Sequence, residues 1–314
     1  TRTISSAASD VYKRQSKFGF ISIVGKTNVG KSTLLNKILE RKLAITSRKP
    51  QTTRNRILGA WNHEDMQAIF LDTPGVHTGH KKALNKYMNQ VAMHALKNVD
   101  LILFIVDRDR WGEEEERIIK QLNGSKIPVI LVINKIDRIK NKEDLLPTIE
   151  KLKAKFDFEE IIPMSALKNK NAPKELYEVI INYLPHGQPH YEEDFVTDLS
   201  KEFFISEIIR EKAINRLGDE LPYSISIIID TLKEDKKLLS ISATIYVDSK
   251  SHKPILLGKK GDMMKSIGTA ARKEIQFEYD KKVFLELWVK VKKKWTDDVN
   301  WISQLGYDLK KYEN

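Results

Sequence analysis

A glycine-rich loop between a short apolar segment and a helical pattern is the strongest constraint in this sequence. Residues 25–32 read Gly-Lys-Thr-Asn-Val-Gly-Lys-Ser and fit the pattern G-x-x-x-x-G-K-[ST]. Residues 21–24 before the loop predict a buried strand, and apolar residues recur at helical spacing over 34–39. Backbone N–H groups in such a strand–loop–helix unit can surround a phosphate, so the sequence predicts a P-loop for a nucleoside triphosphate.

Each residue type in this loop has a defined chemical role. The glycines let the backbone approach phosphate oxygens, Lys31 reaches the β- and γ-phosphates, and the hydroxyl of Ser32 faces Mg²⁺. We expect the whole loop to contact the nucleotide through Gly25, Lys26, Thr27, Asn28, Val29, Gly30, Lys31, Ser32 and Thr33.

A second motif follows the apolar residues 69–71 and supplies a carboxylate. Asp72 begins the sequence Asp-Thr-Pro-Gly, and P-loop enzymes place an acid at such a strand end to orient the Mg²⁺ shell. The N–H of Gly75 can be donated to a γ-phosphate. The sequence therefore predicts a metal site at Ser32 and Asp72, and nucleotide contacts from Asp72, Thr73, Pro74 and Gly75.

A third motif, Asn134-Lys135-Ile136-Asp137, closes another apolar strand and concerns the base. Guanine presents two adjacent donors, N1–H and the 2-amino group, which one carboxylate can accept together, whereas adenine has no such pair. Asp137 therefore selects GTP and GDP, while Asn134 and Lys135 brace the base and the phosphate loop. Backbone N–H groups of Ser165, Ala166 and Leu167 would contact the guanine O6.

The rest of the first half predicts an α/β fold. Strand-like runs alternate with helical patterns, which indicates a mostly parallel sheet with helices on both faces, and a turn at 62–65 indicates one antiparallel hairpin. A chain of 314 residues has room for two domains. We expect residues 1–16 to be a disordered or non-native extension, a GTPase-type domain over 17–185 and a linker at 186–192.

Residues 193–314 change pattern and predict an α+β domain. The order helix, strand, strand, helix, loop, helix, strand is that of a type II KH domain, whose G-x-x-G loop clamps the backbone of single-stranded RNA. From residue 251 onward, 14 Lys and Arg outnumber 9 Asp and Glu, and the whole chain carries +11. The predicted RNA-binding residues are Gly258, Lys259, Lys260, Gly261 and Lys265.

These motifs resemble those of the bacterial Era family of GTPases, over about residues 17–314. In the first half the resemblance lies in residues 25–32, 50–54, 72–75, 134–137 and 165–167. In the second half it lies in residues 207–212, 220–223, 255–268 and 285–291.

The resemblance implies further roles. Thr53 becomes a third metal residue that closes on Mg²⁺ in the GTP state, and Asn28 is associated with hydrolysis assisted by K⁺. The family implies binding to the 3′ end of 16S ribosomal RNA and assistance in assembling the small ribosomal subunit. We expect a monomer in the cytoplasm with peripheral contact to the inner membrane. Its longest apolar runs, 101–106 and 127–133, are far shorter than the roughly 20 residues of a membrane span, and there is no cysteine for disulfides.

The expected hydrolysis is slow, because Val76 stands where Ras-like enzymes carry a water-orienting glutamine. Catalysis would rest on positioning and charge neutralisation by Lys31, Thr53, Gly75 and Asn28 with their ions. The attacking water would be held by backbone or by a partner. His77 is interpreted as a residue of the switch loop rather than a base.

Other functions remain open at this stage. The chain could hydrolyse nucleotide metabolites with the second domain as a structural cap, or act on a non-ribosomal RNA. A constitutive RNA-binding module with a vestigial site is disfavoured by the intact Lys31, Asp72 and Asp137. A tRNA-modifying GTPase would need a further partner domain. Our main hypothesis is that the nucleotide state of the first domain controls RNA binding by the second.

Overall fold

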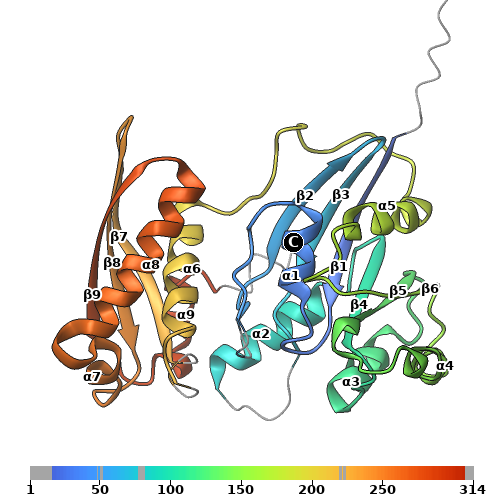
Figure 1. Cartoon of the computed structure of the whole chain (residues 1–314), viewed down its shortest axis with the longest axis horizontal. Helices are drawn as coiled ribbons and strands as arrows, with labels where there is room; N and C mark the ends of the chain where they lie inside the picture. The colour runs from blue at the N-terminus through green and yellow to red at the C-terminus, as the bar shows by residue number, and fades with distance from the viewer. Residues whose placement is uncertain are drawn as a thin grey trace, which may run out of the picture.

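The computed structural model describes residues 16–47, 49, 52–76, 82–218, 221 and 224–307. They form two domains, each built around its own sheet (Figure 1). Some expectations lie outside the described residues. These concern residues 1–15, Pro50, Gln51, His77, Glu220, Pro222 and Tyr223.

The first domain contains a six-stranded sheet in the order β2-β3-β1-β4-β5-β6. The strands are β1 (Lys17–Val24), β2 (Ile57–His63), β3 (Met66–Asp72), β4 (Leu101–Asp107), β5 (Val129–Asn134) and β6 (Glu160–Pro163). All neighbours are parallel except β2 and β3, which form a hairpin with Ile57 opposite Asp72. The predicted mostly parallel sheet with one antiparallel hairpin is confirmed.

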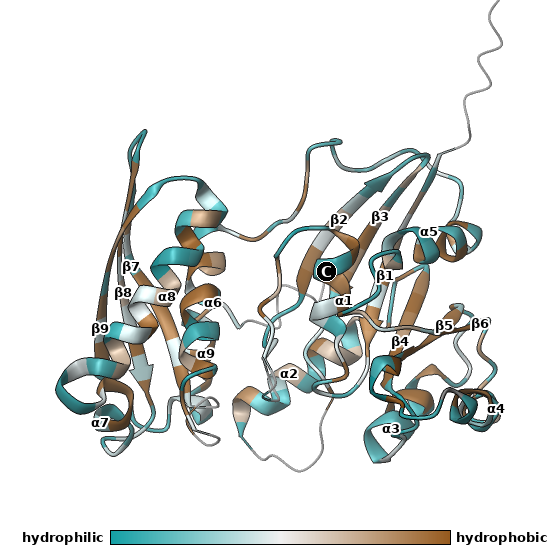
Figure 2. Cartoon of the chain, viewed as in Figure 1, coloured by the Kyte–Doolittle hydropathy of each residue, from teal (hydrophilic) through white to brown (hydrophobic). Residues whose placement is uncertain are grey.

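Helices cover both faces of this sheet because its strands are apolar on both sides. Helices α1 (Lys31–Ile38) and α5 (Ala172–Tyr183) pack on one face, and α2 (Ala83–His94), α3 (Glu113–Leu122) and α4 (Leu145–Lys153) pack on the other. The central strand β4 has no exposed apolar side chain, as a doubly covered parallel strand requires. Figure 2 shows the strands as largely hydrophobic and the outer helix surfaces as hydrophilic.

The carboxyl ends of the parallel strands bring the polar motifs together. The phosphate loop follows β1, Asp72 ends β3, and Asn134 ends β5. Ligands of open α/β sheets bind at this edge, where loops leave the strands toward helices on opposite faces. The topology therefore converts motifs far apart in sequence into one site.

The linker runs along the first domain for longer than expected. The side chain of Gln67 accepts hydrogen bonds from the N–H groups of His190 (2.8 Å) and Tyr191 (2.9 Å). The N–H of Ala60 is donated to the carbonyl of Val196 at 2.8 Å, so the linker covers the edge of β2. It ends at residue 200, before the next helix, rather than at 192.

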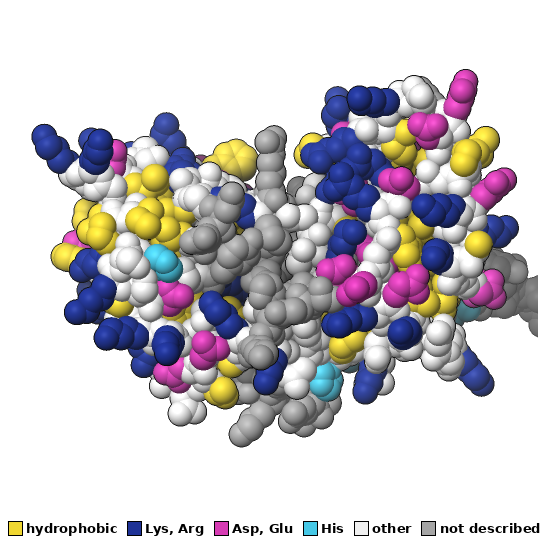
Figure 3. All heavy atoms as spheres, turned by 90° about the horizontal axis from the view of Figure 1, so that it is seen from below, with side chains coloured by type: hydrophobic (Ala, Val, Ile, Leu, Met, Phe, Trp, Pro, Cys, Tyr) yellow, Lys and Arg dark blue, Asp and Glu magenta, His cyan; other side chains and the backbone are white. Residues whose placement is uncertain are grey.

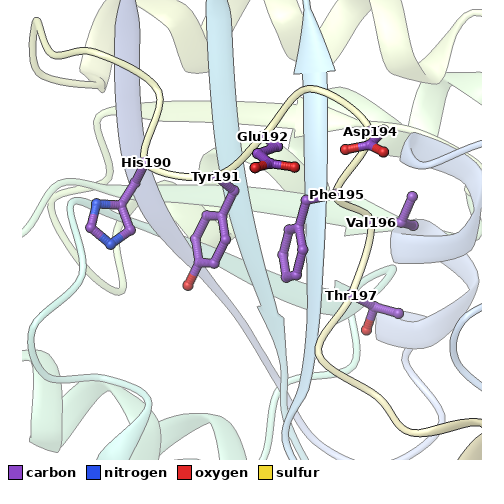
Figure 4. A pocket seen from close by; sticks show the side chains of 7 residues that line it. All are labelled: His190, Tyr191, Glu192, Asp194, Phe195, Val196 and Thr197. Carbon is purple, nitrogen blue, oxygen red and sulfur yellow. The ribbon is translucent and has the colours of Figure 1, made fainter.

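A hollow of about 530 Å³ lies beside this linker, lined only by residues of the segment 190–197 (Figure 4). The rings of Tyr191 and Phe195 stack within the segment, with centroids 4.3 Å apart. None of the motif residues lines the hollow. It is a feature of linker packing and not part of the site described below.

The second domain packs helices on one face of a three-stranded sheet (Figure 1). Strands β7 (Ile225–Glu234) and β8 (Leu238–Val247) are antiparallel, whereas β8 and β9 (Lys282–Val291) are parallel. Helices α6 (Lys201–Ile214), α7 (His252–Leu257) and α8 (Asp262–Tyr279) complete the predicted order of a type II KH domain.

The C-terminal segment joins the two domains. It contains the short helices η5 (Trp295–Asp297) and α9 (Val299–Gln304), which the sequence did not predict. Trp295 is fully buried in a cluster with Leu84 and Met88 of α2, and its Nε1 donates to the carbonyl of Ser224 at 2.8 Å. The tail therefore contacts the first domain as well as its own.

Candidate functional site

The phosphate loop holds a fixed positive charge at its mouth. Lys31 begins α1, and its Nζ donates to the carbonyls of Gly25 (3.1 Å) and Lys26 (2.8 Å). The side chain of Lys31 is only 6% exposed. Its ammonium is thus held over the loop, where it can meet the negative charge of a bound phosphate without first being ordered.

Three predicted metal residues meet at one corner of the site. The Oγ of Ser32 donates to Oδ2 of Asp72 at 2.7 Å and lies 2.8 Å from Oγ1 of Thr53. Asp72 is fully buried, and its Oδ1 has no hydrogen-bond partner among the described residues. Oxygen ligands are those that Mg²⁺ prefers, so this corner fits the ion. When bound, Mg²⁺ would neutralise phosphate charge.

Burial and the neighbouring charges have opposite effects on the pKa values of Asp72 and Lys31. Burial raises the pKa of Asp72 to about 6, although the Lys31 charge and the Ser32 hydrogen bond act in the opposite direction. Burial likewise lowers the pKa of Lys31 to about 8, opposed by Asp72. A bound cation would stabilise the ionised form of this buried carboxylate, which has few hydrogen-bond partners.

The pH dependence of stability should report this balance. The pKa of Asp72 in the folded protein, about 6, lies above its ordinary value of 3.8. The contribution of Asp72 to the free energy of unfolding is therefore fully present below pH 3.8 and is lost as the pH rises through about 6. A shift of this size corresponds to about 3 kcal/mol. Urea unfolding of nucleotide-free, Mg²⁺-free protein between pH 4 and pH 7 should show the wild type losing most of this free energy relative to Asp72→Asn. Parallel pH profiles would contradict it.

The second motif contacts the phosphate loop directly. A Cβ atom on Gly75 would lie 2.6 Å from the backbone nitrogen of Thr27, so only glycine permits this approach. The N–H of Val76 is donated to the carbonyl of Gly25 at 3.3 Å, and Thr73 Oγ1 donates to the carbonyl of Ile23 at 2.9 Å. These bonds hold the Asp-Thr-Pro-Gly segment, including Gly75, against the phosphate loop.

Asn134 connects three motifs on the base side. Its Nδ2 donates to the carbonyl of Val29 at 2.7 Å, and its Oδ1 accepts from the N–H groups of Lys135 (2.8 Å) and Ala166 (2.9 Å). The residue is 2% exposed. Because one side chain satisfies all of these groups, the phosphate loop and the two base-side segments are held in one geometry.

Asp137 lies at the open side of this corner. Its Oδ1 accepts a hydrogen bond from Ser165 Oγ at 2.6 Å, and the neighbouring Leu167 is 71% exposed. Lys135 is in the left-handed region, with φ 62°, and its Nζ donates to the carbonyl of Asn28. Lys168 Nζ lies 3.8 Å from Asp137 Oδ2, and the Asp137 side chain is 16% exposed. A carboxylate that is held in place and still reachable from solvent can accept the paired donors of guanine.

Asp107 is a site residue that sequence reasoning missed. It ends β4, accepts from Arg108 Nε at 2.8 Å and from Lys135 Nζ at 3.0 Å, and so anchors the lysine of the third motif. Burial acts to raise its pKa, but these hydrogen bonds hold the pKa of Asp107 below its usual value. An acid directly after the apolar run 101–106 was the available signal, as for Asp72.

One predicted nucleotide residue points elsewhere. The Nζ of Lys26 lies 3.1 Å from Glu115 Oε1 on α3, and donates to the carbonyl of Arg110 at 3.4 Å. Only the backbone of Lys26 belongs to the loop that would face a phosphate. The other predicted nucleotide residues meet at the same edge of the sheet.

The G-x-x-G segment separates α7 from α8 in the second domain. Gly258 has φ 74° and ψ 178°, a backbone region essentially restricted to glycine. Lys259, Lys260 and Lys265 are exposed around this turn. In the view from below, Lys and Arg side chains are spread along the outer edge of this domain (Figure 3). The turn can therefore present backbone and positive charge to phosphates.

A groove of about 450 Å³ lies between α8, the helix that follows this turn, and β9. Lys265 and Arg272 lie on its helix side, and the backbone approaches closely at Gly268, where a Cβ would meet Leu287 at 3.4 Å. Apolar residues of β9 form the other wall, including Val283, Leu285 and Leu287. An apolar groove with basic flanks suits unpaired bases with their backbone on the charged side.

The fold and these two sites define a P-loop GTPase domain followed by a KH domain. Family comparison agrees, because residues 20–135 match the family described as 50S ribosome-binding GTPase and residues 220–296 match the KH domain. The chain is 48% identical over 290 residues to GTPase Era of Pasteurella multocida, covering 92% of this chain and 94% of the relative. It is 46% identical to GTPase Era of Pseudomonas aeruginosa, covering 93% and 95%.

Solved structures give the same result. An Aquifex aeolicus Era variant bound to GDP and AlF4⁻ matches with a TM-score of 0.89 and 42% identity, covering 93% of this chain and 100% of the other. Era in complex with MgGDPNP and nucleotides 1506–1542 of 16S ribosomal RNA matches with a TM-score of 0.90 and 41% identity, covering 94% and 100%. The chain belongs to the Era family of GTPases.

Proposed function

We propose that this GTPase is a nucleotide-operated switch that binds the 3′ end of 16S ribosomal RNA and assists assembly of the small ribosomal subunit. The proposal is supported by the relative that was crystallised with MgGDPNP and 16S nucleotides, at 41% identity over 94% of this chain. It is also supported by two sites of matching chemistry on one chain, a phosphate loop and a basic clamp.

The G-x-x-G turn at Gly258–Gly261, together with the groove between α8 and β9, is the observation that carries the proposal. A domain that served only as a structural cap would need neither a glycine-only backbone at Gly258 nor exposed lysines at 259 and 260. It would also need no groove between α8 and β9. These features favour an RNA-directed GTPase over a hydrolase of nucleotide metabolites.

The proposed role of each residue in the nucleotide site follows from the geometry of the site. Lys31 neutralises the β- and γ-phosphates, and the N–H of Gly75 is donated to the γ-phosphate. Ser32, Thr53 and Asp72 hold Mg²⁺, supported by their mutual contacts. Asn28, whose φ is 63° within the loop, assists a K⁺ ion. Hydrolysis is slow, because Val76 has no group to orient water.

The base and the cellular setting complete the proposal. Asn134, Lys135 and Asp137 select guanine, with backbone contacts from Ser165–Leu167. The protein acts as a monomer in the cytoplasm and contacts the inner membrane peripherally, which its positive charge favours at an anionic surface. Among the described residues, no helix is both long enough and apolar enough to cross a bilayer.

RNA affinity measured in the two nucleotide states tests the switch. The protein loaded with a non-hydrolysable GTP analogue should bind a labelled single-stranded RNA of the 16S 3′ end with an affinity differing at least about fivefold from the GDP-loaded protein. Fluorescence anisotropy titrations measure both affinities. Equal affinities would count against the switch. Equal binding of an RNA with shuffled sequence would favour a non-ribosomal target.

A further inference from the structure

The segment 52–54 lies between the domains. At its centre is Thr53, the residue proposed to hold Mg²⁺ together with Ser32 and Asp72. Thr53 is 7% exposed, and its Oγ1 lies 2.8 Å from Ser32 Oγ, which in turn donates to Asp72. The side chain of Thr53 therefore closes the corner that fits Mg²⁺. Its position depends on what holds the residues on either side.

Residues of the second domain hold both neighbours of Thr53. Arg210 on α6 donates through Nη2 to the carbonyl of Thr52. Arg54 donates through Nη1 to the carbonyl of Ile225 at 2.7 Å, and its guanidinium lies 5.6 Å from the ring centroid of Trp295. Both arginines are 1% exposed, so these contacts are shielded from water.

Arg210 is itself oriented by an acid one turn earlier on α6. Glu207 Oε1 accepts from Arg210 Nε at 2.7 Å, and Glu207 Oε2 accepts from Nη2 at 2.5 Å. This two-bond pairing fixes the plane of the guanidinium, and Nη2 still reaches the Thr52 carbonyl. A lysine could supply the charge but not this geometry.

We propose that Arg210, oriented by Glu207, is a positioning residue for the Mg²⁺-dependent GTP site of the other domain. By holding the Thr52 carbonyl it keeps Thr53 beside Ser32 and Asp72. The second domain thereby completes the metal corner of the first. This inference rests on the proposed role of Thr53 in holding Mg²⁺.

The interface offers a matched control in the same loop. Lys42 pairs across the domains with Glu211 Oε2 at 2.6 Å and with Glu274. Its removal weakens the interface without touching residues 52–54. A general loosening of the domains would affect both variants, whereas positioning of Thr53 would affect only those at Arg210 and Glu207.

The experiment uses the full chain and a fluorescent GTP analogue, titrated in Mg²⁺ and again in EDTA. Arg210→Ala should weaken binding by about tenfold in Mg²⁺, leave binding in EDTA unchanged and raise the Mg²⁺ concentration for half-maximal GTPase activity. Arg210→Lys should show most of the same loss of nucleotide affinity in Mg²⁺, and Lys42→Ala should show no loss. Glu207→Gln should show a smaller loss in the same direction, and it serves if Arg210→Ala does not fold.

Thr53→Ala separates failure of this inference from failure of the proposed metal site. If Thr53→Ala lowers Mg²⁺-dependent binding and Arg210→Ala does not, the positioning role is overturned while the metal site stands. If neither variant changes Mg²⁺ dependence, the assignment of Thr53 fails. Equal losses in Arg210→Ala and Lys42→Ala, or full recovery in Arg210→Lys, would also overturn the positioning role.

Discussion

Asp137→Asn is expected to weaken GTP binding by about 1,000-fold, since two hydrogen bonds to a charged acceptor are lost or inverted. In the wild type both carboxylate oxygens can accept from guanine N1–H and the 2-amino group. An asparagine side chain presents one donor and one acceptor, so at one of the two contacts its NH2 group would face an N–H donor of guanine and repel it. Titration with fluorescent GTP and GDP analogues measures the loss.

The same variant should gain affinity for a xanthosine nucleotide, whose 2-oxo group can accept from the new amide. Asp157→Asn is the matched control, because it removes an exposed carboxylate from the same domain. It should leave GTP affinity unchanged. Retained GTP affinity in Asp137→Asn, with thermal unfolding like wild type, would show that another group selects the base.

Gly258→Asp is expected to reduce RNA affinity by about 100-fold or more, because a negative charge would face the phosphates that the clamp holds. The backbone adds to the loss. At φ 74° and ψ 178° a side chain is strained, and its Cβ would lie 2.0 Å from Asp262 Oδ1 and 2.7 Å from Met263 Cβ. RNA anisotropy and GTP binding should be measured on the same preparation, with GTP affinity unchanged.

Two further variants show whether the loss of RNA affinity depends on the position of the new side chain, and whether negative charge alone is enough to cause it. Gly124→Asp places the same side chain at another left-handed glycine, φ 83°, with open space around it and far from the clamp, and should leave RNA binding intact. Lys260→Glu changes charge within the clamp at an exposed position and should lower RNA affinity without the clash. Loss of both RNA and GTP binding in Gly258→Asp would mean that the RNA site was misplaced.

The nucleotide site was largely predictable because each of its motifs is local. A strand followed by a polar turn can be recognised without tertiary information, and parallel strands then place all such turns at one edge. Lys31, Ser32, Asp72, Asn134 and Asp137 were found in this way and do meet there. The turn between α7 and α8 was predictable for the same reason, since G-x-x-G between helices is a local signal.

The contacts between the domains could not be predicted in the same way. Glu207 and Arg210 lie on a helix whose pattern predicts only that it is helical, and nothing local indicates that Arg210 reaches Thr52. Trp295 in the C-terminal tail packs against α2 as well as against its own domain, which no local pattern indicates. The longer linker depends on Gln67 and β2, which lie far away in the chain.

The amino-acid order alone thus determined the chemistry of each half, because phosphate, guanine and RNA-backbone recognition depend on short motifs with their own backbone geometry. Only the tertiary structure decided how the halves meet. Burial of Arg54, Arg210 and Trp295 at one interface requires surfaces from both domains at once. No single stretch of sequence carries that information, since the free energy of such a contact exists only after both surfaces have folded.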